Sequence, residues 1–386
     1  MLRSIKRALF HCLAVICVVL VAMAVTAQAK TLGRQGAGWL ESVDGYLVLH
    51  LKGTPYEMGL QHGKLLGEHV RENLRFILRE QGDKTLVAGG PLRVTAKSLL
   101  PGIVKVQRPY VAAKYWDEMR GLADGAGVSV EDVQSANFIP ELFHCSGFAV
   151  MNTATAGGTL YHGRVLDYGV DLRLQEHAVL IVAEPTGGIP FVNVSYAGFI
   201  GSVTGMNAQH VSIGEMGGRG LGAWQGTPMS LLVREVLETA KDLDTAVEVF
   251  RGHKRTCEYY YVIADAKTNR AVGIAATPEN LTEIAPGEAH PRLPKPVADA
   301  VLLSAGSRYD ELVKRVQSQH GKLNADAALH LMDRPVAMRS NLHNVLFEPG
   351  STRLWVANAS QAGEPAAEQK YHAFQLTELL ARRPAE

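Results

Sequence analysis

The chain has 386 residues, with 39 Lys and Arg against 38 Asp and Glu, and 47% of its residues are hydrophobic. This length is enough for one large domain or two small ones. The near-neutral charge, without a basic run or a pattern of aromatics among Lys and Arg, argues against nucleic acid as a partner.

The first 29 residues predict a secretory signal peptide. A basic start is followed by an apolar run at 8–25 and by Ala27-Gln28-Ala29, which supplies small residues at the cleavage positions. We therefore expect an exported protein, periplasmic or extracellular, whose mature chain begins near Lys30 and holds 36 basic against 38 acidic residues. The alternative is an uncleaved anchor, because the run is near the lower limit for a membrane span, and only then is membrane contact expected.

After a predicted strand at 45–51 the chain turns into a helix at 53–59, and helical periodicity predominates up to about Gly127. Ser129 is placed to cap a further helix, with Asp132 three residues later. Residues 30–144 therefore predict a mostly helical segment. Its expected helices lie at 70–81, 96–106 and 115–122.

The character of the chain changes after Cys145. Expected strands lie at 178–183, 191–196, 201–205, 210–214, 259–264 and 271–275, and expected helices at 229–239, 243–251, 308–319, 325–332 and 374–381. Strands cluster in the middle and helices at both ends, which favours layered α+β packing over alternating βαβ units.

Cys145 begins a predicted β-hairpin, which turns at Gly157-Gly158 and returns through 161–168. The returning strand carries Arg164 and Asp167, so a thiol would lie near a cation and a carboxylate. On a regular strand these two side chains would face opposite sides, unless the strand ends or bulges near Asp167. The other interpretation is an ordinary hairpin with a small buried cysteine.

Cysteine usage leaves a second question open. Without the signal the chain holds only Cys145 and Cys257. Two cysteines in an exported protein can form a disulfide, and a disulfide-bonded Cys145 could not be a nucleophile.

Several motifs together resemble the N-terminal nucleophile (Ntn) hydrolases, and among them the peptidase C45 group typified by acyl-coenzyme A:6-aminopenicillanate acyltransferase. The resemblance extends from about Gly45 to Ala357. Its motifs are Gly53-Thr54-Pro55-Tyr56-Glu57-Met58-Gly59 with Gln61-His62-Gly63, Cys145-Ser146-Gly147-Phe148-Ala149, His162-Gly163-Arg164-Val165-Leu166-Asp167-Tyr168, Thr204-Gly205-Met206-Asn207, Gly226-Thr227-Pro228-Met229 leading to Arg234, and Ser340-Asn341-Leu342-His343.

The resemblance implies a fold, a processing step and a mechanism. The fold would be a four-layer αββα sandwich formed by 145–386, preceded by the helical prosegment at 30–144. The precursor would cut itself between His144 and Cys145, and the freed α-amine of Cys145 would then act as the base for its own thiol. An acyl group from a small acylated substrate would pass through a thioester on Cys145 to water or an amine, and the cleaved prosegment would stay bound.

The resemblance also implies roles for individual residues. Asp167 would orient the α-amine, and Arg164 would lie beside the sulfur, where a cation favours the thiolate. Glu215, Asn207 and Asn341 are further candidates for catalysis or substrate binding, although Glu215 is equally a solvated carboxylate and Asn207 equally a turn cap.

The oxyanion donor is not identified by the motifs. Many relatives have a Thr-Asn-His stretch there, whereas this chain has Ala300-Val301-Leu302-Leu303-Ser304-Ala305-Gly306-Ser307-Arg308-Tyr309. Asn341, Asn344, Ser304 or a backbone N–H are the substitutes, and losing such a donor costs on the order of 100-fold in rate.

Three functional hypotheses remain. The first is a self-processing cysteine Ntn hydrolase or acyltransferase acting on linear amides. The second is a thiol peptidase with a separate histidine base, although His62, His162 and His343 lie in contexts typical of structural residues. The third is an exported binding protein with an inert or disulfide-bonded Cys145. The sequence has no zinc-binding or nucleotide-binding motif, so we expect no metal and no cofactor.

Overall fold

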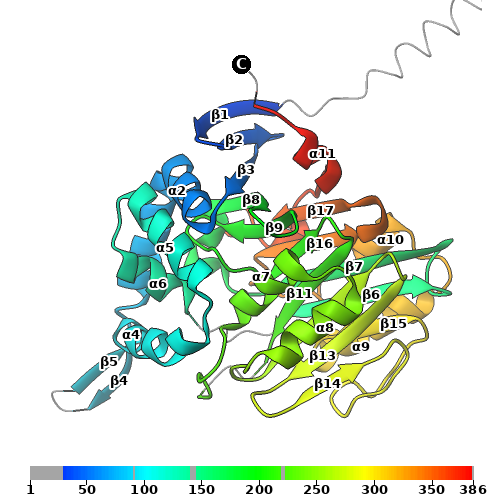
Figure 1. The fold of residues 1–386 in the computed structure, drawn as a ribbon. Helices are drawn as coiled ribbons and strands as arrows, with labels where there is room; N and C mark the ends of the chain where they lie inside the picture. The colour runs from blue at the N-terminus through cyan, green and yellow to red at the C-terminus, as the bar shows by residue number, and fades with distance from the viewer. Residues whose placement is uncertain (1–28, 90–91, 140–144, 219–221, 385–386) are drawn as a thin grey trace, which may run out of the picture.

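The computed structural model describes residues 29–89, 92–139, 145–218 and 222–384 (Figure 1). Residues 1–28 of the predicted signal at 1–29, and His144 of the predicted cleavage site, lie outside the described residues.

The larger of the two main sheets in these ranges has ten strands. Their spatial order is β1 (Ala29–Gln35), β2 (Gly38–Val43), β3 (Tyr46–Gly53), β8 (Ala178–Pro185), β9 (Phe191–Tyr196), β10 (Thr204–Asn207), β11 (Val211–Gly217), β12 (Tyr259–Asp265), β13 (Arg270–Ala276) and β14 (Leu281–Ile284). β-Branched and aromatic residues fill its central strands, and nearly all of them are buried because both faces of this sheet are covered.

The second main sheet carries the predicted Cys145 hairpin. In the described chain its order is β15 (Ala300–Leu303), β6 (Ser146–Asn152), β7 (Gly158–Leu166), β16 (His343–Glu348), β17 (Arg353–Asn358) and β18 (His372–Gln375). All of its pairings are antiparallel, and β6 pairs with β7 as the Gly157-Gly158 turn predicted.

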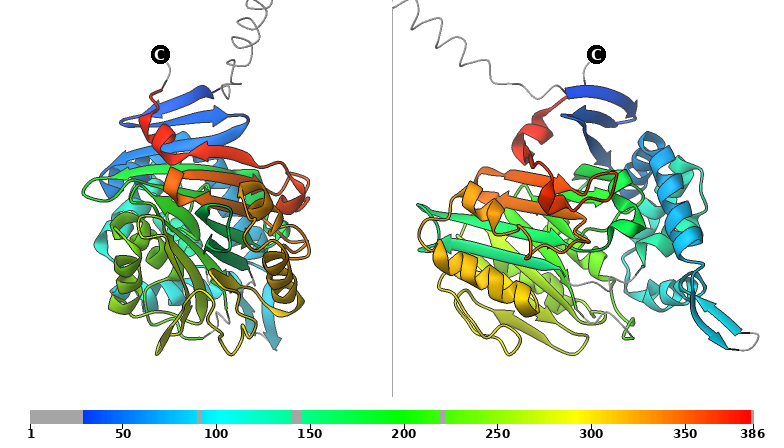
Figure 2. Two further views of the ribbon diagram at one scale, coloured as in Figure 1. Left: turned by 90° about the vertical axis from the view of Figure 1, so that its right-hand side faces the viewer. Right: turned by 180° about the vertical axis from the view of Figure 1, so that it is seen from behind.

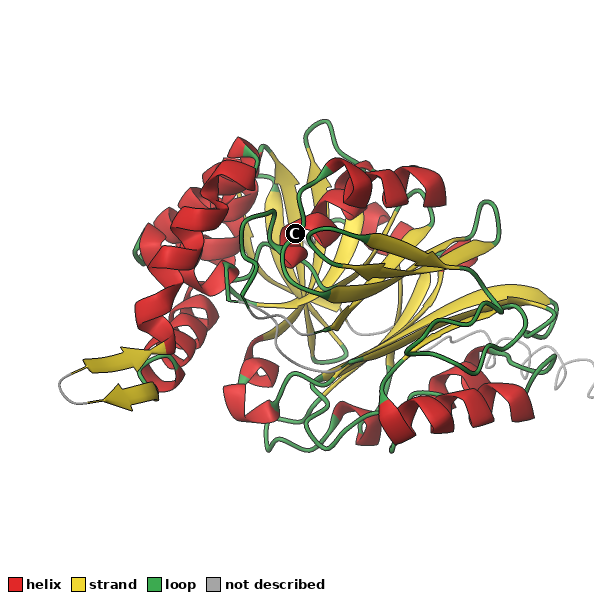
Figure 3. Cartoon of the chain, turned by 90° about the horizontal axis from the view of Figure 1, so that it is seen from below, coloured by secondary structure: helices red, strands yellow, loops and turns green. Residues whose placement is uncertain are grey.

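The two sheets pack face to face, with β6 and β7 against β11 and β12. Helices cover both outer faces (Figure 3). The large sheet is covered by α7 (Met229–Thr239) and α8 (Leu243–Gly252), and the small sheet by α9 (Gly306–Ser318) and α10 (Ala325–His330). This arrangement confirms the predicted α+β class and the four-layer αββα sandwich.

The N-terminal segment forms a helical lobe beside the sandwich, and its β4–β5 hairpin projects away from both (Figures 1 and 2). Its elements are α2 (Pro55–Leu65), α3 (Gly67–Arg75), a π-helix (Phe76–Gln81), β4 (Thr85–Gly89), β5 (Leu92–Thr95), α4 (Ala96–Gln107), α5 (Ala113–Ala126) and α6 (Val130–Asn137). Ser129 caps α6 as the sequence predicted. Thr54 and Glu57 form a capping box at the start of α2.

This segment is more than helical, because β1, β2 and β3 extend the large sheet. β3 pairs in parallel with β8, which joins the segment to the sandwich by backbone hydrogen bonds. Sequence patterns gave the strand at 45–51 but not β1 and β2, whose ladders lie at the outer edge of the sheet. The chain ends in α11 (Leu376–Ala381). No helix in the described ranges has the length and hydropathy needed to cross a bilayer.

A buried ionic network also joins the lobe to the sandwich. Arg234 of α7 donates to both carboxylate oxygens of Glu118 of α5, at 3.2 and 3.1 Å, and to Glu238 at 2.8 Å. Lys114 of α5 donates to Glu238 at 2.6 Å. Arg234 is 3% exposed, so these charges interact with little screening by solvent.

Candidate active site

Cys145 lies directly before β6, an inner strand of the smaller main sheet. Its neighbour Ser146 pairs with Val165 of β7, so Cys145 lies beside the end of that strand. The residue is 3% exposed. Its backbone carbonyl accepts a hydrogen bond from Nη2 of Arg308 at 3.0 Å.

Asp167 follows β7, which ends at Leu166. The strand therefore ends before Asp167, as one of the two sequence interpretations required. The Asp167 side chain need not point to the face opposite that of Arg164. Its Oδ2 accepts from Nη1 of Arg308 at 3.0 Å, and its Oδ1 accepts from the backbone N–H of Met338 at 2.9 Å. Burial raises the pKa of Asp167 to about 6, although Arg308 opposes the shift.

Arg308 is the residue that sequence reasoning missed. Its guanidinium contacts three groups at once: the Cys145 carbonyl, the Asp167 carboxylate and the hydroxyl of Ser146, the last at 2.6 Å. Arg308 lies in the first turn of α9, where a cation is unfavourable to the helix dipole. A basic residue in the first turn of a predicted helix was therefore the one sequence signal for Arg308, because it indicates a role other than helix stability.

Arg164 and Glu215 form an ion pair between the sheets. Nη2 of Arg164 on β7 lies 3.3 Å from Oε2 of Glu215 on β11, and both side chains are fully buried. Gly214 makes room for this contact, because a Cβ there would lie 2.5 Å from Cγ of Arg164. The structure thus brings Glu215 to Arg164, and the solvated-carboxylate interpretation of Glu215 is wrong.

Asn341 lies close to the cluster and Asn207 does not. The amide of Asn341 donates to the carbonyl of Leu166 at 3.1 Å, and the same side chain helps to lower the pKa of Asp167. The amide of Asn207 instead donates to Leu237 and Ala240 at the end of α7, while its oxygen accepts from Gln209 and Val211. Asn207 therefore has the turn-capping position that the sequence left open.

Two of the other oxyanion candidates are partly engaged. The hydroxyl of Ser304 lies 2.7 Å from that of Ser146, which places it next to Cys145. Asn344 accepts from Asn341 at 3.0 Å and donates to Tyr371 at 3.2 Å. Of these two candidates, Ser304 is therefore the one that contacts the residue next to Cys145.

The three histidines named by the sequence are buried and poorly suited as bases. Burial lowers the pKa of His62 to about 4 and that of His162 to about 3, and it places the pKa of His343 well below the ordinary range. His62 accepts from the N–H of Gly198, His162 contacts Ser212, and His343 contacts both Tyr196 and Thr204. These contacts are structural.

The two cysteines are not joined. Neither Cys145 nor Cys257 is part of a disulfide, so the predicted alternative of a disulfide between them is wrong. Cys257 contacts the carbonyl of Ala223 at 3.7 Å, and burial raises the pKa of its thiol.

A cavity of about 540 Å³ lies between the helical lobe and the sandwich. Leu166 and Tyr168, which flank Asp167, are part of its wall, so it opens beside the cluster. Most of its lining is apolar, including Leu100, Ile103 and Phe138 from the lobe. Its volume is in the usual range for a small-molecule site.

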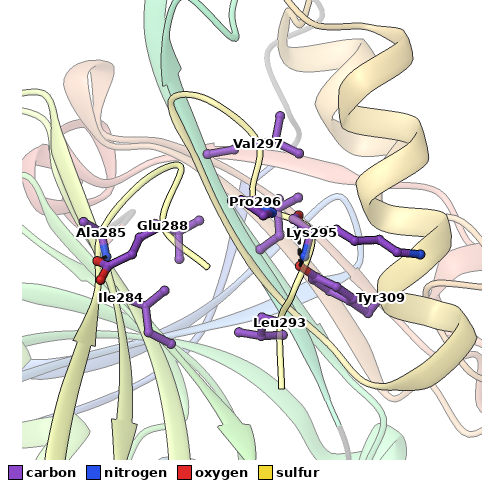
Figure 4. Close-up of a pocket in the computed structure, with 11 residues that line it drawn as sticks. Ile284, Ala285, Glu288, Leu293, Lys295, Pro296, Val297 and Tyr309 are labelled. Atoms are coloured by element: carbon purple, nitrogen blue, oxygen red, sulfur yellow. Dashed lines mark hydrogen bonds between the residues drawn. The ribbon is translucent and has the colours of Figure 1, made fainter. Parts of the chain in front are cut away.

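A second hollow is too small to hold a substrate. It has a volume of about 10 Å³, room for about one water, and lies between β14, β15 and α9 (Figure 4). Tyr309 accepts from and donates to the backbone of Lys295 there, which ties the 285–297 loop to α9.

Among the described residues, no group of three or more His, Cys, Asp or Glu side chains gathers as a metal site would require. The arrangement around Cys145 supplies a thiol, two buried carboxylates, Asp167 and Glu215, and the guanidinium groups of Arg308 and Arg164, with an apolar cavity nearby.

Comparison with known proteins agrees with the motifs. The sequence profile of the acyl-coenzyme A:6-aminopenicillanic acid acyl-transferase family matches residues 153–290. An uncharacterized protein of Archaeoglobus fulgidus is 29% identical over 276 residues, covering 62% of this chain and 44% of that protein. The N-acylethanolamine-hydrolyzing acid amidase of Cavia porcellus is 24% identical, covering 46% of this chain and 52% of that protein.

Among solved structures, the Caenorhabditis elegans ortholog of that amidase aligns with a TM-score of 0.43 and 18% identity, covering 53% of this chain and 93% of its own. The chain spans about half the length of the curated relatives it matches. The profile match over residues 153–290 agrees with the resemblance that the motifs indicate.

Proposed function

We propose that this member of the acyl-coenzyme A:6-aminopenicillanic acid acyl-transferase family is an exported, self-processing cysteine hydrolase or acyltransferase of linear amides. The observation that carries the proposal is the position of Arg308, which holds both the backbone of Cys145 and the carboxylate of Asp167. The neighbours of Asp167, Leu166 and Tyr168, line an apolar cavity, and such a cavity suits an acyl group because it offers apolar contacts to a chain.

The first step is cleavage of the peptide bond before Cys145, by attack of its own thiol on the carbonyl of residue 144. An N-to-S acyl shift gives a thioester, and water then releases the 30–144 segment and regenerates the thiol. The α-amine of Cys145 is freed in the same event. Its unperturbed pKa of about 7.7–8 leaves a useful neutral fraction near neutral pH.

The same thiol then acts on the substrate amide. Its sulfur attacks the acyl carbon while its proton passes to the α-amine, and that proton later leaves with the departing amine as the C–N bond breaks. Water or an acceptor amine then adds to the thioester carbon, and the sulfur takes back a proton. Asp167 orients the α-amine, and Arg308 fixes Asp167 and the Cys145 backbone in one geometry.

Arg164 of β7 and Glu215 of β11 are further members of the proposed site. The Arg164 cation is buried, so it favours a thiolate or an oxyanion nearby more strongly than an exposed cation would. Ser304 is our candidate for an additional oxyanion donor, since its hydroxyl contacts that of Ser146. Export is supported by the basic start, the apolar run and the small residues at 27–29.

The test is intact-mass analysis and N-terminal sequencing of the purified protein beside Cys145→Ala. We expect two fragments in the wild type, beginning near Lys30 and at Cys145, and one uncut chain in the variant. Cys257→Ala is the matched control, because Cys257 is an equally buried free thiol and should leave cleavage unchanged. An uncut wild-type chain would favour the peptidase or the binding-protein hypothesis.

The same samples report the reaction. Because the Cavia porcellus relative is named for hydrolysing N-acylethanolamines, N-acyl ethanolamides are the first substrates to offer, and released amine is the readout. Thioester capture by hydroxylamine in the wild type, and its absence in Cys145→Ala, would place the acyl group on this sulfur.

A further inference from the structure

Each carboxylate oxygen of Asp167 has its own donor. Oδ2 accepts from Nη1 of Arg308, a side chain of α9, and Oδ1 accepts from the backbone N–H of Met338. Met338 lies in the segment at 331–342, which joins α10 to β16 through turns and loop. A backbone N–H points where its segment directs it, so the second hydrogen bond depends on what fixes that segment.

Arg315, also on α9, binds the first part of this segment. Its Nη1 and Nη2 donate to four backbone carbonyl oxygens at 2.8–3.3 Å, those of His330, Leu331, Asp333 and Arg334. Its Nε donates to the carboxylate of Glu311, one turn earlier on the same helix, at 2.9 Å, which orients the guanidinium. The Arg315 side chain is 20% exposed, so water competes little for these hydrogen bonds.

The carbonyl of Asp333 connects Arg315 to Met338. It accepts from Nη1 of Arg315 at 2.8 Å and from the backbone N–H of Val336 at 3.0 Å. Val336 is two residues before Met338, and the side chains of Val336 and Ala337 are buried in the core. The short stretch from the shared carbonyl to the N–H of Met338 is therefore held at both ends and packed between them.

The alternative is that Arg315 only caps α10. The carbonyls of His330 and Leu331 belong to the end of that helix, where a cation is favourable. The carbonyls of Asp333 and Arg334 lie beyond the helix, and at 2.8 Å they are the two shortest contacts that Arg315 makes with backbone oxygens. The contacts therefore extend past what helix capping requires.

We propose that Arg315 is a positioning residue for Asp167, because it fixes the backbone that presents the N–H of Met338 to Oδ1. Arg308 and Arg315 are seven residues apart and so lie on one face of α9. One helix then directs the donors of both oxygens. This inference rests on the proposed function for the role of Asp167 in orienting the α-amine, and Arg315 takes no part in bond breaking.

The first measurement requires no turnover. Carboxyl ¹³C NMR of the uncleaved Cys145→Ala chain follows the titration of Asp167, whose resonance is the one that Asp167→Asn removes. A hydrogen bond to the charged form lowers a carboxyl pKa, and the N–H of Met338 acts in this way on Asp167. We expect Arg315→Met to raise the pKa of Asp167 by about one unit, the effect of losing one hydrogen bond to a charged group.

The other groups that face Asp167 are unchanged in this variant. They are the guanidinium groups of Arg308 and Arg164 and the amide of Asn341, all of which lower the pKa of the carboxyl. A rise in that pKa would therefore report the Met338 donor. An unchanged titration of Asp167 in Arg315→Met, or in Arg315→Lys should the methionine variant fail to fold, would overturn the proposal.

Two control variants separate positioning from general effects. Lys314→Met removes the neighbouring cation of α9, whose only printed ion pair is an exposed contact of 3.7 Å with Glu311. Val247→Ala removes core packing from α8, on the outer face of the other sheet, and so lowers stability without contacting this segment. Both should leave the titration of Asp167 unchanged, and a shift in either as large as in Arg315→Met would refute a specific role for Arg315.

The cleaved enzyme gives a second readout with dodecanoyl ethanolamide. Because ionised Asp167 is the form that orients the α-amine, a higher pKa moves the acidic limb of kcat/KM to higher pH. We expect this limb to move in Arg315→Met by about as much as the NMR titration, with kcat reduced more than KM is changed. An acidic limb that stays in place in the folded variant would contradict the proposal.

The two measurements distinguish this inference from the proposed function. A raised pKa of Asp167 in Arg315→Met, in a protein without amidase activity, would support the inference and refute the function. Amidase activity with the titration and the acidic limb both unchanged in Arg315→Met would leave the function standing and overturn the inference.

Discussion

Nη1 of Arg308 lies 3.0 Å from Oδ2 of Asp167, while Nη2 of the same guanidinium lies 3.0 Å from the carbonyl oxygen of Cys145. One side chain from α9 thus holds the ends of two neighbouring strands, β6 and β7, in a fixed relation. A lysine could reach only part of this set, because it lacks the planar fork of donors.

Arg308→Lys should therefore impair the reaction more than the fold. We expect kcat/KM to fall by roughly 100-fold, comparable to the loss of one preorganised donor in other active sites. Release of amine from an N-acyl ethanolamide measures this. Arg334→Lys, which alters a surface pair with Glu368, is the control and should be neutral. Unchanged kcat/KM in Arg308→Lys would show that the Arg308 contacts are not needed for the reaction.

Asp167 should make the stability of the uncleaved chain depend on pH. Burial raises its pKa from 3.8 to about 6, so the folded state holds this proton more tightly than the unfolded state. Its contribution is then greatest below pH 3.8 and is lost as pH rises through about 6, a change of about 3 kcal/mol. Unfolding of Cys145→Ala by urea between roughly pH 4 and 7, with and without Asp167→Asn, measures it. Parallel pH profiles for the two proteins would contradict the shifted pKa.

Removing one charge of the buried Arg164–Glu215 pair should lower the stability of the protein strongly. In the Cys145→Ala chain, Glu215→Gln leaves the buried guanidinium facing a neutral amide, and we expect a loss of about 3–5 kcal/mol. The double change Arg164→Met with Glu215→Leu should recover much of that stability, since it removes both buried charges. In the Cys145 chain the same double change should still abolish turnover. Recovery of activity along with stability would show that the pair is only structural.

Gly214 should not tolerate a side chain. A Cβ there would lie 2.5 Å from Cγ of Arg164, so Gly214→Ala must displace the guanidinium. We expect a loss of about 1–3 kcal/mol, as for other overpacked cores, together with a fall in kcat/KM. Gly252→Ala is the matched control, because a Cβ at that helical glycine meets no atom within 4 Å. Equal behaviour of the two alanine variants would refute the steric account.

Arg234 should control how firmly the lobe stays on the sandwich after cleavage. Arg234→Met leaves Glu118 and Glu238 buried without this cation, and we expect a loss of about 3–5 kcal/mol. Size-exclusion chromatography of the cleaved protein should then show the two pieces separating. Lys52→Met, which breaks an exposed pair with Glu184, should leave them together. Persistent association in Arg234→Met would mean that apolar contacts and the β3–β8 ladder suffice.

Much of the fold followed from local patterns. The strands between Cys145 and residue 276, the helices on either side and the Gly157-Gly158 turn depend on periodicity and turn chemistry, which act over a few residues. The later strands β14 to β18 were not predicted. The site was predicted in part. Cys145, Arg164 and Asp167 lie on one hairpin, so their proximity could be inferred from the chain itself. β1 and β2 were not predicted, because they pair onto β3 at the edge of the large sheet and the rest of that sheet is formed by residues distant in the sequence.

The sequence alone determined the resemblance to the acyltransferase family, the layered α+β class and the hairpin that carries a thiol, a cation and a carboxylate. Only the tertiary structure decided which distant residues complete that group: Arg308 from α9, Glu215 from β11, and the lobe helices that form one wall of the cavity. The reason is physical. Periodicity reports which face of an element is buried, whereas the partner of a buried charge depends on which elements pack against that face. The chemistry around Cys145 therefore depends on how elements pack that are separated by as many as 163 residues in the sequence.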